Sequence, residues 1–301
     1  MKLIIRIDDV GYSRAHNIGS FKAIDEGVAT SADTMLDCPG TEEALEFLRD
    51  RPWITVGWHT HFWGSPVLEA EKIPSLVDKV NGMVFFRKDI QRSQEIEYSQ
   101  IYAEAKAQIE RCIRILGRPP DTGAGRSGGS TFSQAIYDVS KEYGMPTNFI
   151  KMGRYDPPSE FSKMMQHDET ELGPIYSVNG ESALGMLSYM KIETMTLREA
   201  VSYQPLRYFL EDPCRMLSYG EDECVMAVLH PGAVDDFVMS RGSNITYYLS
   251  RPLDTMCLVS RELHDWIKDN RVVLSNFNDC LYGSRTYQNH LKQMGSDLYI
   301  E

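Results

Sequence analysis

The chain of 301 residues has no long hydrophobic run and little positive charge. No segment approaches the roughly 20 apolar residues that a membrane helix needs, so a membrane-spanning protein is not expected. The apolar run in the N-terminal MKLIIRIDDVG is too short for a secretory signal, which predicts a cytoplasmic protein. A formal net charge of −12 disfavours nucleic acid as a partner, because phosphate binding needs clustered lysine and arginine.

The sequence also lacks common cysteine and nucleotide-binding motifs. None of the six cysteines stands in CxxC or CxxH spacing, so free thiols in the core are expected rather than zinc or redox groups. No GxxxxGK[ST] occurs, and the glycine-rich GAGRSGG (123–129) follows PPDT rather than a clear strand, so its GRSGG is not expected to form a nucleophile elbow. Nucleotide binding is therefore disfavoured.

The first part of the chain has a regular alternation of strand-like and helix-like segments. Three segments rich in apolar and β-branched residues predict strands: KLIIRID (2–8), VATSADTML (28–36) and WITVGWHTHF (53–62). One helix between them is capped near Ser13, and another covers GTEEALEFLRDRP (40–52). Strands that alternate with helices predict βαβ units and a parallel sheet or barrel.

The rest of the chain is less regular. In chain order we expect a loop (64–93), a helix (95–116), a second helix (133–144) and an irregular insertion (about 151–219). A strand (224–229), a helix (253–268) and a last strand (272–279) follow. No internal repeat or low-complexity linker interrupts the sequence, so residues 1–301 are predicted to form a single domain.

Two adjacent carboxylates, Asp8 and Asp9, follow the first predicted strand. In parallel α/β folds the ligand site lies at the C-terminal strand ends. Neighbouring side chains on a strand face different ways, so one carboxylate can bind a metal while the other holds or takes a proton. The alternative is that Asp-Asp-x-Gly is only a polar turn.

Histidines stand at the ends of two other predicted strands. His59 and His61 are two residues apart, so on a strand both project to one face and can bind one ion. The alternative is that His61 packs among its aromatic neighbours and binds nothing. His230 follows CVMAVL and precedes Pro-Gly, a position suited to a general acid or base. Structural or solvent-facing roles are expected for the others: His16, His167, His264 and His290.

In IIRIDDVGYS, VGWHTHFW, SKEYGMP and VLHPGAVDD, kept in this order, the chain resembles the YdjC-like family of carbohydrate deacetylases. The resemblance implies an α/β fold, a single distorted (β/α) barrel of the TIM-like deacetylase type with parallel strands. It also implies metal-dependent hydrolysis of an N-acetyl group from an amino sugar or short chito-oligosaccharide, with a divalent ion such as Mg or Zn. A homodimer would be ordinary for a barrel of this size.

The same resemblance implies a role for four residues. Asp9 and His59 correspond to metal ligands, Asp8 to the general base, and His230 to a group that faces the reacting centre as acid or charge stabiliser.

The chain departs from this family after the GRP loop. Family members carry a His-rich element of the form HxDSHxHxH, which supplies a third metal ligand, whereas this chain reads PDTGAGRSGGST (120–131). His61 stands where the family more often has Asn, so we expect it to complete an Asp9–His59–His61 site. Arg126 on the altered loop is a candidate for binding a substrate phosphate or carboxylate, or else a solvated arginine.

Two other functions stay open. A degenerate family member would bind a sugar or sugar phosphate without hydrolysing it. An amidohydrolase-type barrel would bind one or two ions through the HxH pair and would need ligands on later strands, where His230 with Asp235 or Asp236 comes close.

Overall fold

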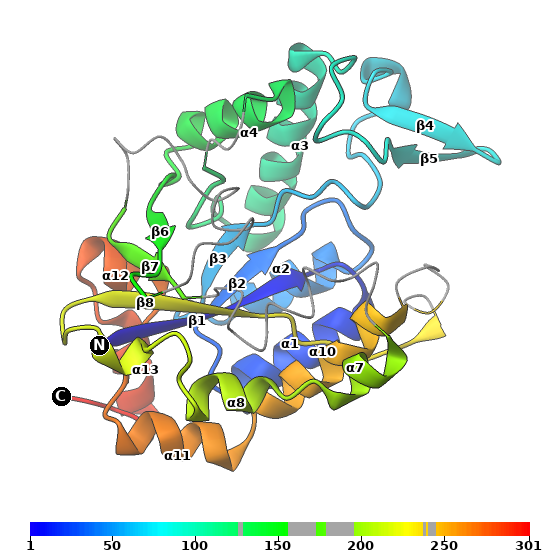
Figure 1. Ribbon diagram of the computed structural model, residues 1–301. Helices are drawn as coiled ribbons and strands as arrows, with labels where there is room; N and C mark the ends of the chain where they lie inside the picture. Colours follow the sequence, from blue (N-terminus) through cyan, green and yellow to red (C-terminus); the bar gives the residue numbers. More distant parts are fainter. Residues whose placement is uncertain (126–128, 156–172, 179–195, 237–238, 240–244) are drawn as a thin grey trace.

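A curled parallel sheet with helices ranged around it forms the centre of the molecule (Figure 1). The computed structural model describes residues 1–125, 129–155, 173–178, 196–236, 239 and 245–301. Its strands follow the order β3-β2-β1-β8-β7-β6, and β9 also pairs with β1. These strands, all paired in parallel, are β1 (Lys2–Val10), β2 (Ser31–Thr34), β3 (Thr55–Trp58), β6 (Ile150–Met152), β7 (Ile175–Ser177), β8 (Cys224–Leu229) and β9 (Val273–Leu274).

The helices and a separate hairpin complete the described elements. Strands β4 (Val77–Val80) and β5 (Met83–Phe86) pair antiparallel, apart from the main sheet. The helices are α1 (Arg14–Asp25), α2 (Thr41–Arg49), α3 (Tyr98–Leu116), α4 (Thr131–Glu142), α7 (Leu197–Ser202), α8 (Pro205–Leu210), α10 (Ile245–Leu258), α11 (Arg261–Asp269), α12 (Phe277–Tyr282) and α13 (Thr286–Gln293), with short 3₁₀ turns at Ala70–Lys72 and Met216–Ser218. In the part of the chain that the structure describes, no helix is both long and apolar enough to cross a membrane.

The predicted parallel α/β architecture is confirmed, and the sheet has the shape of a half-barrel. Among the described residues β3 and β6 do not pair with each other. Instead a single parallel bridge joins Gly57 to Thr122, and the N–H of Gly123 donates to the carbonyl of Pro146 at 3.0 Å. These contacts continue the curl from β3 towards the strand that follows α4.

The central strand β1 is apolar in its first part and carries charged residues towards its C-terminal end. Leu3, Ile5 and Ile7 are fully buried in the main core, as expected for a strand covered on both faces. Ile4 points the other way, into a second apolar cluster with Met226 and Phe277. Because side chains alternate along a strand, Arg6 and Asp8 follow Ile4 on that same face. The apolar cluster thus ends where charged residues begin.

The segment 64–93, predicted to be a loop, contains the hairpin of β4 and β5. Its turn is Asn81-Gly82, and both residues have positive φ, 52° and 77°. Asn-Gly between short apolar runs is the strongest local signal for a two-residue hairpin turn, so the prediction missed information that the sequence holds.

Three predicted boundaries also shift. The helix predicted over 253–268 is two helices, because Ser260 ends the first and its side chain caps α11 by accepting from the N–H of Leu263. The strand predicted over 272–279 ends at Leu274, since Asn276 and Asp279 form a reciprocal capping box that begins α12. Within the stretch predicted to be irregular, about 151–219, the described parts include β7, α7 and α8.

Candidate active site

The end of β1 brings two adjacent carboxylates to one place. The register between β1 and β2 shifts between Ile7 and Val10, and Asp9 has a φ of 60°. Aspartate enters this left-handed region more readily than most residues, and such irregularities redirect side chains. The predicted opposite orientation of Asp8 and Asp9 is therefore wrong: Oδ1 of Asp9 lies 3.0 Å and Oδ2 of Asp8 4.0 Å from Nε2 of His59.

The sequence predicts that both histidines lie on the third strand. In the structure they lie just beyond its end. The strand ends at Trp58, although the N–H of His59 still donates to the carbonyl of Thr34 at 3.0 Å. Their rings meet edge to face, with centroids 4.3 Å apart and planes at 87°. Possible ligand atoms of Asp9, His59 and His61 all lie within 4.8 Å of one another.

His230 joins this group from the end of β8. Its Nε2 lies 3.8 Å from Oδ2 of Asp8. The imidazole is held there through the main chain, because the buried carboxylate of Asp254 accepts the N–H of His230 at 2.8 Å. The five residues singled out in the sequence thus meet at the C-terminal ends of β1, β3 and β8.

Other candidates from the sequence do not enter this group. Arg126 and His167 lie outside the described residues. Among the residues that the structure describes, two groups could hold a metal ion, Asp9–His59–His61 and Asp8–Asp33–His59, and Asp235 and Asp236 belong to neither.

Arg6 and Asp33 are parts of the site that the sequence reasoning missed. Nε of Arg6 lies 2.7 Å from Oδ1 of Asp8, and its Nη1 lies 3.3 Å from Oδ2 of Asp33. That same carboxylate oxygen lies 3.9 Å from Nδ1 of His59. The sequence could have indicated both residues. Arg6 stands two positions before Asp8 on one strand, and Asp33 is a charged residue inside the buried segment SADT.

Arg251 was also missed, whereas the expectation for His16 is not contradicted. Arg251 on α10 is 1% exposed and donates to Oδ2 of Asp9 at 2.5 Å. His16 was expected to be structural or solvent-facing; it is fully buried on α1, with Nδ1 2.8 Å from the hydroxyl of Ser13. No local motif marks Arg251, because its partner lies 242 positions away in the chain.

The charges around the two carboxylates keep both of them ionised. Burial alone would raise the pKa of Asp9, but Arg251 and His59 hold it well below its ordinary value. Burial would likewise raise the pKa of Asp8, but the positive charges of Arg6 and then of His59 outweigh this effect and lower it. Both side chains therefore offer negatively charged oxygens at neutral pH.

The three histidines differ in their protonation. Burial opposes the charged form of His59, but Asp8 and Asp9 raise its pKa to about 9. Burial, followed by the positive charge of His59, lowers the pKa of His61 to about 3. Burial lowers the pKa of His230 to about 4, although the two carboxylates oppose this. His61 and His230 are thus neutral at pH 7.

The chemistry of Asp9, His59 and His61 fits a divalent metal ion. Two imidazoles and a carboxylate are a typical donor set for catalytic zinc. Nε2 of His59 is buried and faces Oδ1 of Asp9 at 3.0 Å. A cation bound by these atoms would compete with the proton on His59.

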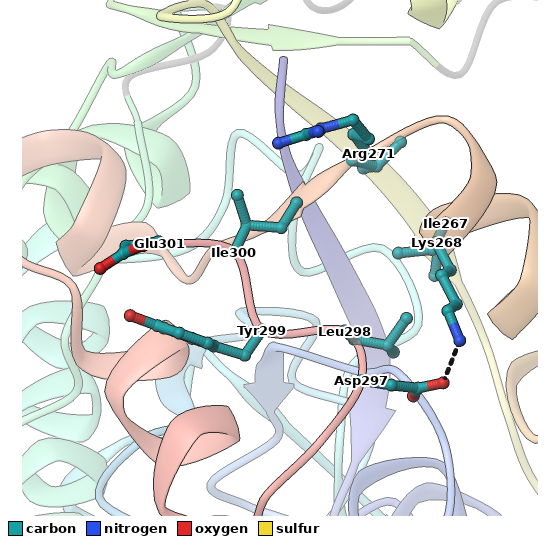
Figure 2. A pocket seen from close by; sticks show the side chains of 9 residues that line it. Ile267, Lys268, Arg271, Asp297, Leu298, Tyr299, Ile300 and Glu301 are labelled. Carbon is teal, nitrogen blue, oxygen red and sulfur yellow. Dashed lines mark hydrogen bonds and ion pairs between the residues drawn. The ribbon is translucent and has the colours of Figure 1, made fainter.

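A hollow of about 230 Å³ lies elsewhere, between α11 and the C-terminal residues (Figure 2). Lys268, Arg271 and Tyr299 are among its lining residues, and Lys268 forms an ion pair with Asp297 there. It adjoins β9, which pairs with the first residues of β1. The hollow is therefore near the opposite end of the strands from Asp8 and Asp9, and it contains none of the candidate site residues.

Comparisons with known proteins identify the family and the fold. The sequence model of a family described as YdjC-like protein matches residues 2–269. Carbohydrate deacetylase 2 of Listeria innocua is 24% identical over 289 residues, which cover 93% of this chain and 98% of the relative. Chitooligosaccharide deacetylase of Proteus mirabilis is 31% identical over 121 residues, which cover 40% of this chain and 46% of the relative. A crystal structure from Enterococcus faecalis V583 shares the fold, with a TM-score of 0.63 and 21% identity over 93% of this chain and 98% of that one.

Proposed function

Because the chain belongs to the YdjC-like protein family, we propose that it hydrolyses the N-acetyl group of an amino sugar or short chito-oligosaccharide with the help of a divalent metal ion. The observation that carries the proposal is the cluster of Asp9, His59 and His61 directly beside Asp8 and His230. The names of the relatives, carbohydrate deacetylase and chitooligosaccharide deacetylase, support the substrate class.

In this proposal Asp9, His59 and His61 hold the ion. A divalent ion bound by them supplies a Lewis acid that polarises the acetyl carbonyl and lowers the pKa of water. The chain's own contribution is to keep Asp9 ionised through Arg251 and to keep His61 neutral, so that a carboxylate oxygen and an imidazole lone pair are available.

Asp8 acts as the general base. Hydrolysis forms a bond between the oxygen of water and the acyl carbon and breaks the bond between that carbon and the amide nitrogen. The ionised carboxylate of Asp8 takes a proton from water, while Arg6 holds the carboxylate in place at 2.7 Å.

His230 returns that proton to the leaving nitrogen. It is neutral at pH 7, and its Nε2 lies 3.8 Å from Oδ2 of Asp8, so it accepts the proton and passes it on. The products are the free amine and acetic acid, which loses its proton to the solvent and becomes acetate, and Asp8 and His230 end in their starting states.

Acetate release tests this function. The purified protein is stripped with a chelator, reloaded with Zn²⁺ or Mg²⁺, and incubated with N,N′-diacetylchitobiose. We expect acetate only from the reloaded protein, and none from Asp8→Asn, which should retain the ion. Saturable sugar binding without acetate from the reloaded wild type would instead identify a protein that recognises the sugar without hydrolysing it.

A further inference from the structure

Trp63 is an exposed tryptophan next to the candidate metal ligands. Its side chain is 44% exposed, whereas Trp58 and Trp266 are 3% and 8% exposed. An isolated exposed apolar residue needs no special explanation, but Trp63 packs against two other rings. Its ring stacks on His61 with centroids 4.1 Å apart and planes at 8°, and it meets the ring of Tyr12 edge to face at 6.1 Å and 79°.

This stacking fixes how Trp63 is presented. His61 covers one face of the indole, so the face turned away from His61 supplies exposed apolar area. The ring of His61 in turn contacts that of His59, with centroids 4.3 Å apart. Trp63 is therefore separated from Asp9 and His59 by the full ring of His61. Tyr12 is buried, and its ring lies parallel to that of Tyr248 within 6°, with centroids 6.4 Å apart.

We propose that the outer face of Trp63 is a sugar subsite, which binds the pyranose ring next to the one that is deacetylated. The proposal rests on the proposed function. A pyranose ring exposes a face of C–H groups that is apolar and slightly positive, which complements the negative face of an indole. Since the ring of His61 intervenes, a sugar stacked on Trp63 lies one unit away from the reacting acetamide. The subsite therefore favours a disaccharide or longer substrate over a monosaccharide.

Kinetics with two substrates test the subsite. For Trp63→Ala we expect KM for N,N′-diacetylchitobiose to rise roughly tenfold, equivalent to about 1.4 kcal/mol, with little change in kcat. KM for N-acetylglucosamine should stay the same, because the monosaccharide does not reach Trp63. Trp63→Phe retains an aromatic face and should restore most of the affinity. Tyr282→Ala removes an aromatic side chain that is 67% exposed on α12 and should change neither KM.

Measurement of the metal content distinguishes a sugar subsite at Trp63 from a role in which Trp63 only positions His61. Trp63→Ala should bind as much metal as the wild type; a loss of metal would show that Trp63 only positions His61, and would overturn the subsite. An equal rise of KM for both substrates would overturn it as well.

Calorimetry distinguishes this inference from the proposed function. If the wild type binds the disaccharide but releases no acetate, the catalytic proposal fails, and weaker binding by Trp63→Ala still supports the subsite. If the wild type does not bind the disaccharide at all, both proposals are wrong.

Discussion

The guanidinium of Arg251 donates a hydrogen bond to Oδ2 of Asp9 at 2.5 Å, and both side chains are only 1% exposed. The two oxygens of Asp9 thus have different surroundings, because Oδ1 faces His59 at 3.0 Å. A helix near the end of the chain therefore neutralises a carboxylate on the first strand, and the second oxygen of that carboxylate lies against a candidate metal ligand.

Removal of this buried cation should destabilise the protein strongly. Arg251→Met leaves the carboxylate of Asp9 buried without its guanidinium, and losing one partner of such a pair costs about 3–5 kcal/mol. Urea unfolding of the metal-free protein measures the loss. Arg207→Met is a suitable control, because it removes only the exposed pair with Glu211 and should change the free energy of unfolding by less than about 1 kcal/mol. Equal effects of the two substitutions would contradict this account of the Arg251–Asp9 pair.

The stability of the metal-free protein should fall as the pH becomes alkaline. The pKa of His59 is raised from 6.5 to about 9 in the folded protein, so between these values the folded chain keeps a proton that the unfolded chain has lost. The stabilisation by Asp8 and Asp9 is thus fully present below pH 6.5 and is lost as the pH rises through 9. Unfolding experiments across this range should show the loss for the wild type and not for His59→Gln. If the free energy of unfolding of the wild type instead rose relative to that of His59→Gln with increasing pH, the predicted direction of the pH dependence would be wrong.

A methyl group at Gly57 should disturb the site without changing any charge. Gly57 on β3 pairs with Asp33 on β2, and a Cβ at Gly57 would lie 2.0 Å from Oδ1 of Asp33. In Gly57→Ala the carboxylate must move away from Arg6 and His59, so we expect acetate release to fall at least tenfold, roughly 1.4 kcal/mol in transition-state stabilisation. Gly220→Ala, where the nearest atom to the new Cβ is 3.5 Å away, should keep full activity. Full activity of Gly57→Ala would show that the position of Asp33 is unimportant.

Asp254 should affect kcat, because its carboxylate holds the main chain of His230 in place. Its two oxygens accept the N–H of His230 and the hydroxyl of Tyr203, both at 2.8 Å. Asp254→Asn turns one of these acceptors into a donor, which displaces His230, so we expect kcat to fall about tenfold, or roughly 1.4 kcal/mol, with metal content unchanged. Asp212→Asn is the matched control, because Asp212 likewise accepts two hydrogen bonds, from the N–H groups of Met216 and Leu217. An unchanged kcat for Asp254→Asn would exclude a positioning role.

Local patterns in the sequence predict the elements that bear the site. The Ile-rich β1, the cap of α1 at Ser13 and the apolar β8 are all where the sequence places them. Their signals are local: hydrophobic runs, a serine that accepts the N–H of His16, and Pro-Gly after His230. Parallel topology then predicts that Asp8, His59 and His230 meet.

Contacts between distant segments could not be predicted in this way. Asp9 reaches the same place as Asp8 only because its φ is positive where the register of β1 shifts, and a single sequence does not specify such a conformation. Arg251 lies outside the helix that the sequence predicts over 253–268, whereas in the structure it stands within α10, directly before Pro252. Its role becomes visible only when α10 packs beside α1.

The central claim is that His61 completes a metal site with Asp9 and His59. Calorimetric titration of the metal-free protein with Zn²⁺ tests it, in the wild type, in His61→Ala and in His264→Ala, a control that removes a histidine paired with Asp297 outside the site. We predict one ion per chain for the wild type and the control, and for His61→Ala at least tenfold weaker binding together with loss of acetate release. Unchanged Zn²⁺ affinity in His61→Ala would contradict the account.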